Sequence, residues 1–128
     1  MSNQTFWINT MKVIGVDPGL AATGVGVADG KWLKVTRHAF GCIQTARTTA
    51  LPMRLAEIYS GITRVLKDEN PDLMVVEDVF SLERYPKSGI TLGKVTGVIL
   101  LAGCQADIPV AEVAVREAKQ VITGNGNA

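Results

Sequence analysis

The segment Val13–Gly19, with the sequence VIGVDPG, constrains the fold of this chain more than any other. Four residues typical of a buried strand lead to a single carboxylate at Asp17, and Pro18-Gly19 then turns the chain. The alternating valines and glycines of Thr23–Val27 predict a second strand that runs back beside the first. We therefore expect an antiparallel pair of strands with an acid at the tip of its first strand.

Two interpretations of Asp17 follow from its place in this segment. An aspartate at the end of a buried strand is costly unless positive charge compensates it, and a metal ion is the usual compensation. Alternatively, Asp17 opens an Asp-Pro-Gly turn and only caps backbone groups. The segment alone leaves both interpretations open.

The composition limits the class of protein. A chain of 128 residues fits one domain, and a hydrophobic content of 47% suits a sheet covered on both faces. The net charge of +1 provides no global basic field, so a polyanion would have to be bound by a local cluster or through metal. Cys42 and Cys104 lie in apolar surroundings, which favours buried free thiols over a disulfide. They form no metal-ligand spacing with the one histidine, so we expect no zinc site.

The ends and the hydropathy of the chain predict a soluble, cytoplasmic protein without membrane contact. Residues 1–10 are polar overall and contain no signal peptide, so we interpret them as a leader outside the core. The longest apolar stretch, around Val98–Ala102, is too short and too broken by glycine to span a bilayer. Residues 11–128 are then expected to form one domain.

The hydrophobic periodicity predicts strands and helices in the order β-β-β-α-β-α-β-α. The expected strands are Lys12–Asp17, Thr23–Ala28, Lys31–Ile43, Leu73–Val76 and Pro109–Val115. The expected helices run from Leu51 to a stop at Asn70-Pro71, over Ile90–Gln105 and over Arg116–Ile122. Asp29-Gly30 is typical of a type I′ hairpin turn between the second and third strands.

These elements predict an α/β fold with a five-stranded mixed sheet in the order 3-2-1-4-5, whose first three strands are antiparallel, with helices on both faces. The carboxyl ends of strands one and four then meet where the order reverses, and ligands bind at such points. Asp17 and Glu77 lie at these two ends, about 5 Å apart at the backbone. Their oxygens suit Mg²⁺, or Mn²⁺. The alternative is that Glu77 pairs with a surface lysine or arginine.

Aromatic and basic residues follow this acidic edge. Phe80 either caps the core or stacks on an unpaired base. Five cations could contact phosphates on either side of a scissile bond, although each alone is an ordinary solvated charge. They are Arg84, Lys87, Lys94, Arg116 and Lys119. Gly93 and Gly97 lie on one helix face and permit close approach, either of another element of the chain or of a second copy.

Four segments in order resemble the RuvC-type crossover junction endodeoxyribonucleases. They are Val13–Val27, Val75–Phe80, Leu92–Val98 and the late segment from Pro109 through Arg116–Gln120 to Gly126. The first segment alone is also similar to the opening of actin-like ATPases and sugar kinases, whereas the four together are specific. The resemblance covers about Met11 to Ala128.

The resemblance implies a ribonuclease H-like fold and a homodimer that nicks four-way (Holliday) DNA junctions symmetrically with Mg²⁺ in recombination and repair. Asp17 and Glu77 match the first two acidic metal ligands, which are catalytic in that family. Phe80 matches the aromatic residue that enters the junction centre, and Lys119 lies in the basic DNA-contacting segment. A branch-migration motor complex is a further partner implied by the family.

The sequence departs from the family pattern at its carboxyl end. In the family a further helix supplies two more acidic ligands, and this chain stops at Ala128, before that helix. We therefore expect a nuclease domain truncated at the C-terminus that binds metal weakly and cleaves poorly or not at all. The alternative is a non-catalytic module for junction binding or dimerisation. A third interpretation is that the chain is one half of an actin-like ATPase, but this would need a second lobe. A lesser alternative is ribonuclease activity on RNA–DNA hybrids.

Overall fold

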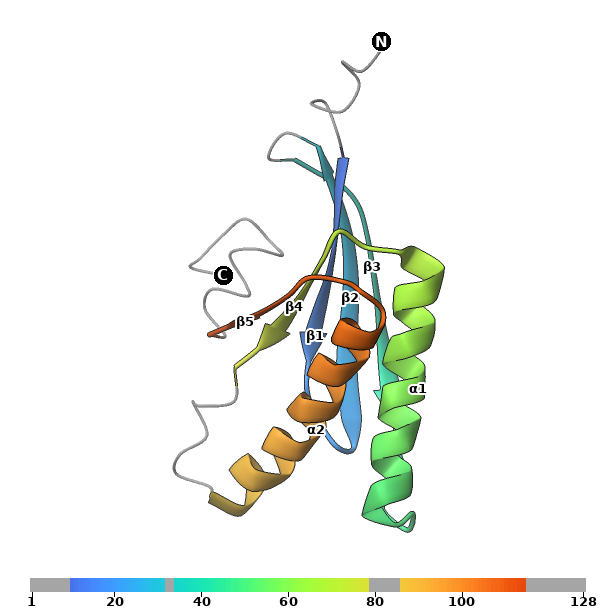
Figure 1. Cartoon of the computed structure of the whole chain (residues 1–128), viewed down its shortest axis with the longest axis vertical. Helices are drawn as coiled ribbons and strands as arrows, with labels where there is room; N and C mark the ends of the chain where they lie inside the picture. The colour runs from blue at the N-terminus through green and yellow to red at the C-terminus, as the bar shows by residue number, and fades with distance from the viewer. Residues whose placement is uncertain (1–9, 32–33, 79–85, 115–128) are drawn as a thin grey trace.

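The computed structural model describes residues 10–31, 34–78 and 86–114 as one mixed sheet with two helices packed on it (Figure 1). The strands lie in the order β3-β2-β1-β4-β5. The strands are β1 (Thr10–Asp17), β2 (Ala22–Lys31), β3 (Lys34–Gln44), β4 (Leu73–Glu77) and β5 (Val110–Val113), and the helices are α1 (Leu51–Glu69) and α2 (Pro86–Gln105). The predicted element order through the fifth strand is confirmed.

The strand directions also follow the prediction. β1, β2 and β3 are antiparallel neighbours, whereas β4 is parallel to β1, and β5 is parallel to β4. β1 begins at Thr10, inside the expected leader. The expected last helix, over Arg116–Ile122, and residues 1–9 lie outside the described residues.

The core lies between one face of the sheet and the two helices. Because side chains alternate along a strand, Ile14 and Val16 of β1 point to the same face, and both are buried. Strands β2 and β4 add Val25, Val27, Met74 and Val76 to this core, and the helices add Ile58, Ile62, Leu66, Val95, Ile99 and Ala102. Both described helices cover this one face, so the helix expected on the other face is not among the described elements.

The ends of α1 follow from its sequence. Pro52 lies in its first turn, where a missing N–H costs nothing. Asn70 ends the helix in the left-handed conformation, with φ 45°, and its N–H donates to the Leu66 carbonyl over 2.8 Å. α2 begins at Pro86 rather than at Ile90 as predicted. Neither helix combines the length and the apolar character that crossing a membrane requires.

The prediction of a hairpin turn at Asp29-Gly30 is wrong. β2 continues through these residues to pair Lys31 with Lys34, which leaves residues 32–33 to connect the strands. A type I′ turn needs positive φ at both central positions, and in the described part of the chain only Asn70 and Asp107 have it among non-glycine residues. The Asp-Gly pair instead coincides with a shift in the register between β2 and β3, a frequent role of glycine in strands.

The cysteines are free, as predicted, but they are not buried. Cys42 and Cys104 are both exposed. Cys42 pairs across the sheet with Gly24, on the face that α1 and α2 do not cover. The prediction that Cys42 is buried was wrong because successive side chains of β3 alternate between the two faces, and the side chain of Cys42 points away from the core.

Candidate active site

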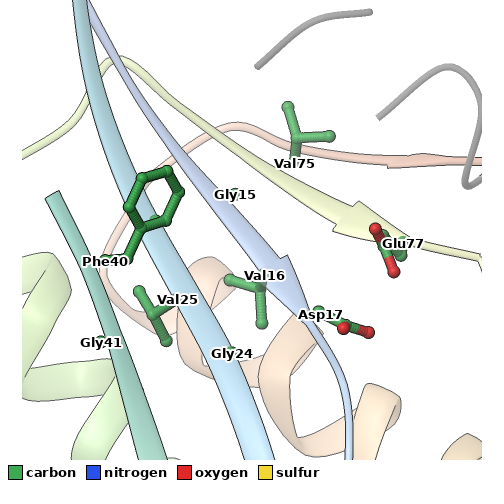
Figure 2. A pocket seen from close by; sticks show the side chains of 10 residues that line it. Gly15, Val16, Asp17, Gly24, Val25, Phe40, Gly41, Val75 and Glu77 are labelled. Carbon is green, nitrogen blue, oxygen red and sulfur yellow. The ribbon is translucent and has the colours of Figure 1, made fainter. Parts of the chain in front are cut away.

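Two carboxylates meet at the carboxyl ends of β1 and β4. The parallel register pairs Val16 with Val76, the residues that directly precede Asp17 and Glu77. Adjacent strands lie about 5 Å apart, so the two acids are neighbours across the strands. Figure 2 shows both carboxylates at the strand tips, and both residues line one pocket. The predicted juxtaposition of Asp17 and Glu77 is therefore present in the structure.

This pocket lies on the face of the sheet that α1 and α2 leave uncovered. Val16 faces the core and is buried, so the next residue, Asp17, points to the opposite face, where it is exposed. Glu77 is half-buried. The acid at the end of a buried strand therefore avoids most of the desolvation cost that the sequence suggested, because its own side chain reaches solvent.

Glycines on the sheet surface leave space for this pocket because they carry no side chains. Gly15, Gly24 and Gly26 lie along it in neighbouring strands. A Cβ atom at Gly24 would lie 3.5 Å from the Cβ of Asp17, and one at Gly26 would lie 3.1 Å from the ring of Phe40. Side chains here would fill the pocket, which has a volume of about 190 Å³. At about 30 Å³ for each water, this volume is enough for a hydrated ion.

Phe40 is a part of this pocket that the sequence analysis did not identify. Its ring lies over Gly26, and 73% of the residue is exposed (Figure 2). The sequence suggested only a large hydrophobic residue in the third strand. The signal that distinguishes it is the register, which pairs Phe40 with Gly26 and so places it on the same face as Asp17.

The turn after Asp17 is fixed by glycine and by a buried hydroxyl. A Cβ atom at Gly19 would collide with the carbonyl oxygen of Ala22, so this close turn requires glycine. Thr23 is fully buried, and its Oγ1 donates to the Gly19 carbonyl over 2.7 Å. The loop that leaves Asp17 is thereby tied to the first residues of β2.

The donor set of this edge fits a hard divalent cation. Mg²⁺ is commonly bound through one or two carboxylates together with waters and substrate phosphates. Asp17 and Glu77 provide two such carboxylates in a solvent-accessible pocket. No group of three or more histidine, cysteine, aspartate or glutamate residues is close enough to hold a metal in the part of the chain that the structure describes. The candidate site therefore has two protein ligands here.

The other predicted site residues are not brought to this pocket by the described structure. Lys94 is exposed on α2 and does not line the pocket. Lys87 lies in the first turn of α2, and its side chain is beyond what the structure describes. The remaining predicted DNA contacts, Phe80, Arg84, Arg116 and Lys119, lie outside the described residues.

Comparison with protein families and curated proteins gives a consistent match. The family described as crossover junction endodeoxyribonuclease RuvC matches residues 13–128. The RuvC of Pectobacterium carotovorum is 37% identical over 116 residues, which are 91% of this chain and 66% of that protein. The RuvC of Desulforamulus reducens is 35% identical over 92% of this chain and 72% of its own length. The chain thus spans about two thirds of the length of these relatives.

Solved structures agree with these matches. The structure described as Thermus thermophilus RuvC in complex with Holliday junction substrate is similar, with a TM-score of 0.77 and 27% identity, over 87% of this chain and 69% of that one. The yeast mitochondrial Holliday junction resolvase Ydc2, at 12% identity and a TM-score of 0.56, shares the fold. The sheet order, the two acids at the carboxyl ends of β1 and β4, and these matches together show that the chain belongs to the RuvC family of crossover junction endodeoxyribonucleases.

Proposed function

We propose that this chain is the part of a structure-selective endonuclease that binds four-way DNA junctions and provides two of the metal ligands for nicking them. The observation that carries the proposal is the placement of Asp17 and Glu77 at the tips of adjacent parallel strands, in one pocket. Family membership and the structure of Thermus thermophilus RuvC bound to a Holliday junction support four-way DNA as the substrate of this site. The curated relatives come from bacteria, whose DNA lies in the cytoplasm, so we also propose that the chain acts there.

In this proposal Asp17 and Glu77 hold Mg²⁺, or Mn²⁺, with one carboxylate from each strand. Held by these two carboxylates, such an ion would stabilise negative charge on the scissile phosphate and lower the pKa of a bound water. The two strands fix the spacing of the carboxylates, and the glycines of the pocket leave room for the phosphate to approach them. Without an ion the two adjacent acids repel each other, so the site favours a cation on electrostatic grounds.

The DNA contacts in this proposal come from the aromatic and basic residues that the sequence places after β4 and β5. Phe80 would enter the junction centre, and the cations would hold phosphates. These cations are Arg84, Lys87, Lys94, Arg116 and Lys119. Partnership with a branch-migration motor stays a prediction of the family resemblance.

We propose further that two copies pair through one face of α2. Ile90 is 64% exposed and Leu101 is 48% exposed, and they share a helical stripe with Gly93 and Gly97. A Cβ atom at either glycine would have no heavy atom within 4 Å, so no described element packs against this stripe. A helix face that is apolar, smooth and exposed suits a second copy of the same face.

Gly97→Arg tests this pairing. The charge and bulk would block close approach, so we expect the dimer to become a monomer in sedimentation analysis. Glycine is about 0.8–1 kcal/mol less favourable than alanine in a helix interior, and arginine ranks close to alanine, so α2 itself should not be weakened. Ser60→Arg, on the exposed surface of α1, is the matched control and should leave the assembly unchanged. A monomeric unmodified chain, or a dimer that survives Gly97→Arg, would contradict the proposal.

The nuclease proposal is tested by a gel assay on labelled four-way and linear DNA with Mg²⁺ or EDTA. We expect any nicking to be paired, confined to the junction and absent in EDTA. Asp17→Asn and Glu77→Gln should each reduce it by at least about 100-fold, since each removes one of two charged ligands. Nicking that persists in both variants, or equal cutting of linear DNA, would show that the proposed site is wrong.

A second function is favoured by one observation: no third metal-ligating side chain joins Asp17 and Glu77 among the described residues. In this second function the chain holds junction DNA without cutting it, as a binding module of the same fold would. A junction-specific shift in the gel without metal-dependent nicking would favour this function. Metal-dependent nicking by the chain would favour the nuclease.

A further inference from the structure

Arg54 lies in an unexpected environment at the start of α1. The periodicity of this helix places it between the apolar positions, yet only 9% of the residue is exposed. A positive charge in the first turn opposes the helix dipole, and this turn contains no acidic residue. No described residue forms an ion pair with Arg54, so burial of its charge costs stability at this place.

Arg54 is connected to the loop between β1 and β2 through one hydroxyl. Its Nε donates to Thr45 Oγ1 over 2.8 Å, and this hydroxyl donates to the Leu20 carbonyl over 2.6 Å. A threonine hydroxyl has a single proton, so accepting from Arg54 leaves that proton for Leu20. Arg54 therefore orients the hydroxyl toward the loop.

The same loop is held at three successive carbonyls. Thr23 Oγ1 donates to Gly19, Thr45 Oγ1 donates to Leu20, and the Thr45 N–H donates to Ala21 over 3.0 Å. These carbonyls begin two residues after Asp17, at the turn by which the chain leaves β1. The loop therefore has little freedom to move, although the carboxylate beside it is exposed.

We propose that Arg54 is a positioning residue for Asp17, acting through Thr45 on the loop that follows the acid. The inference rests on the proposed function, in which Asp17 is a metal ligand. Arg54 has no role at the ion itself: it fixes the direction of a hydroxyl, the hydroxyl fixes the Leu20 carbonyl, and the loop fixes the end of β1. Removal of a partner that hydrogen-bonds a metal ligand directly commonly changes metal affinity 10- to 100-fold. Arg54 acts on Asp17 through the loop, so we expect an effect at the lower end of this range.

The test uses Thr45→Val, Thr45→Ser and Arg54→Met, with Arg64→Met on the exposed surface of α1 as the control. Valine has nearly the shape of threonine without its hydroxyl, and serine restores the hydroxyl. Mn²⁺ affinity is measured by titration calorimetry. We expect the dissociation constant to rise at least about tenfold in Thr45→Val and Arg54→Met, and to stay within about twofold in the other two.

Amide hydrogen exchange supplies a readout that does not depend on metal. The N–H groups of Gly19 and Thr45 both bond within this network. They should exchange about tenfold faster in Thr45→Val and Arg54→Met, while amides of β4 stay unchanged. Because both variants break one relay, the double variant should be no worse than either single one. If Arg54→Met does not fold, Thr45→Val and Thr45→Ser still make the comparison.

The outcomes separate this inference from the proposed function. Faster exchange at Gly19 and Thr45 with unchanged Mn²⁺ affinity would make Arg54 a merely structural residue and overturn the inference. A raised dissociation constant in Thr45→Ser equal to that in Thr45→Val would overturn it too, since the hydroxyl would then be irrelevant. If the unmodified chain binds no Mn²⁺, the proposed function fails, and unchanged exchange in both variants would then overturn the positioning role independently.

Discussion

The two faces of the sheet are built from the same strands and differ in almost every physical property. On the face covered by α1 and α2, β1 contributes Ile14 and Val16, which are buried in a continuous apolar core. On the other face the alternate positions of β1 are Gly15 and Asp17, which line the pocket. One strand thus supplies stability on one side and a candidate site on the other, because successive side chains point in opposite directions.

This difference shows why the acids can lie at the end of a hydrophobic strand. The covered face supplies the burial that holds β1 and β4 together, so the uncovered face is free to carry charge and glycine. Substitutions on the covered face should therefore change stability, and substitutions on the uncovered face should change metal binding.

The largest effect on stability should come from the covered face. Ile62 is 1% exposed in the core, and Ile62→Ala should lower the free energy of unfolding by about 2–5 kcal/mol because it removes buried apolar contacts and leaves a cavity. Urea denaturation measures this loss. Met53→Ala, at an exposed position of the same helix, should change it by less than about 0.5 kcal/mol. Equal losses in the two variants would contradict the assignment of the core.

A smaller effect is expected from Phe40 on the uncovered face. Because most of its surface already reaches solvent, Phe40→Ala should lower the free energy of unfolding by less than about 1 kcal/mol in the same denaturation experiment. A phenylalanine in a packed core would cost about 3–5 kcal/mol. A loss in that range would mean that the two faces are equally packed and that the pocket is not open.

The sequence predicted the sheet order and the meeting of Asp17 with Glu77 because both follow from period and direction. A run of buried-strand residues identified β1, the crossover rule made β4 parallel to it, and the acids at the two ends then had to be neighbours. Neither step requires knowledge of which residues far apart in the sequence contact each other.

The sequence could not predict features that depend on register or on tertiary packing. Asp29-Gly30 has the composition of a turn, but the pairing of Lys31 with Lys34 carries the strands past it. Phe40 is exposed, and Arg54 is buried, because of the elements that lie beside them. The environment of such residues can be predicted only when the residues that lie beside them in the fold are known.

The central claim is that Asp17 and Glu77 together hold one divalent cation on the uncovered face. A Mn²⁺ titration followed by electron paramagnetic resonance tests it most directly, with the unmodified chain beside Asp17→Asn and Glu77→Gln. We expect one site in the unmodified chain, displaced by Mg²⁺ and lost in either variant. In the absence of metal the urea midpoint of each variant should be unchanged or slightly raised, because each substitution removes one of two adjacent like charges. Binding of equal affinity in all three proteins would contradict the claim.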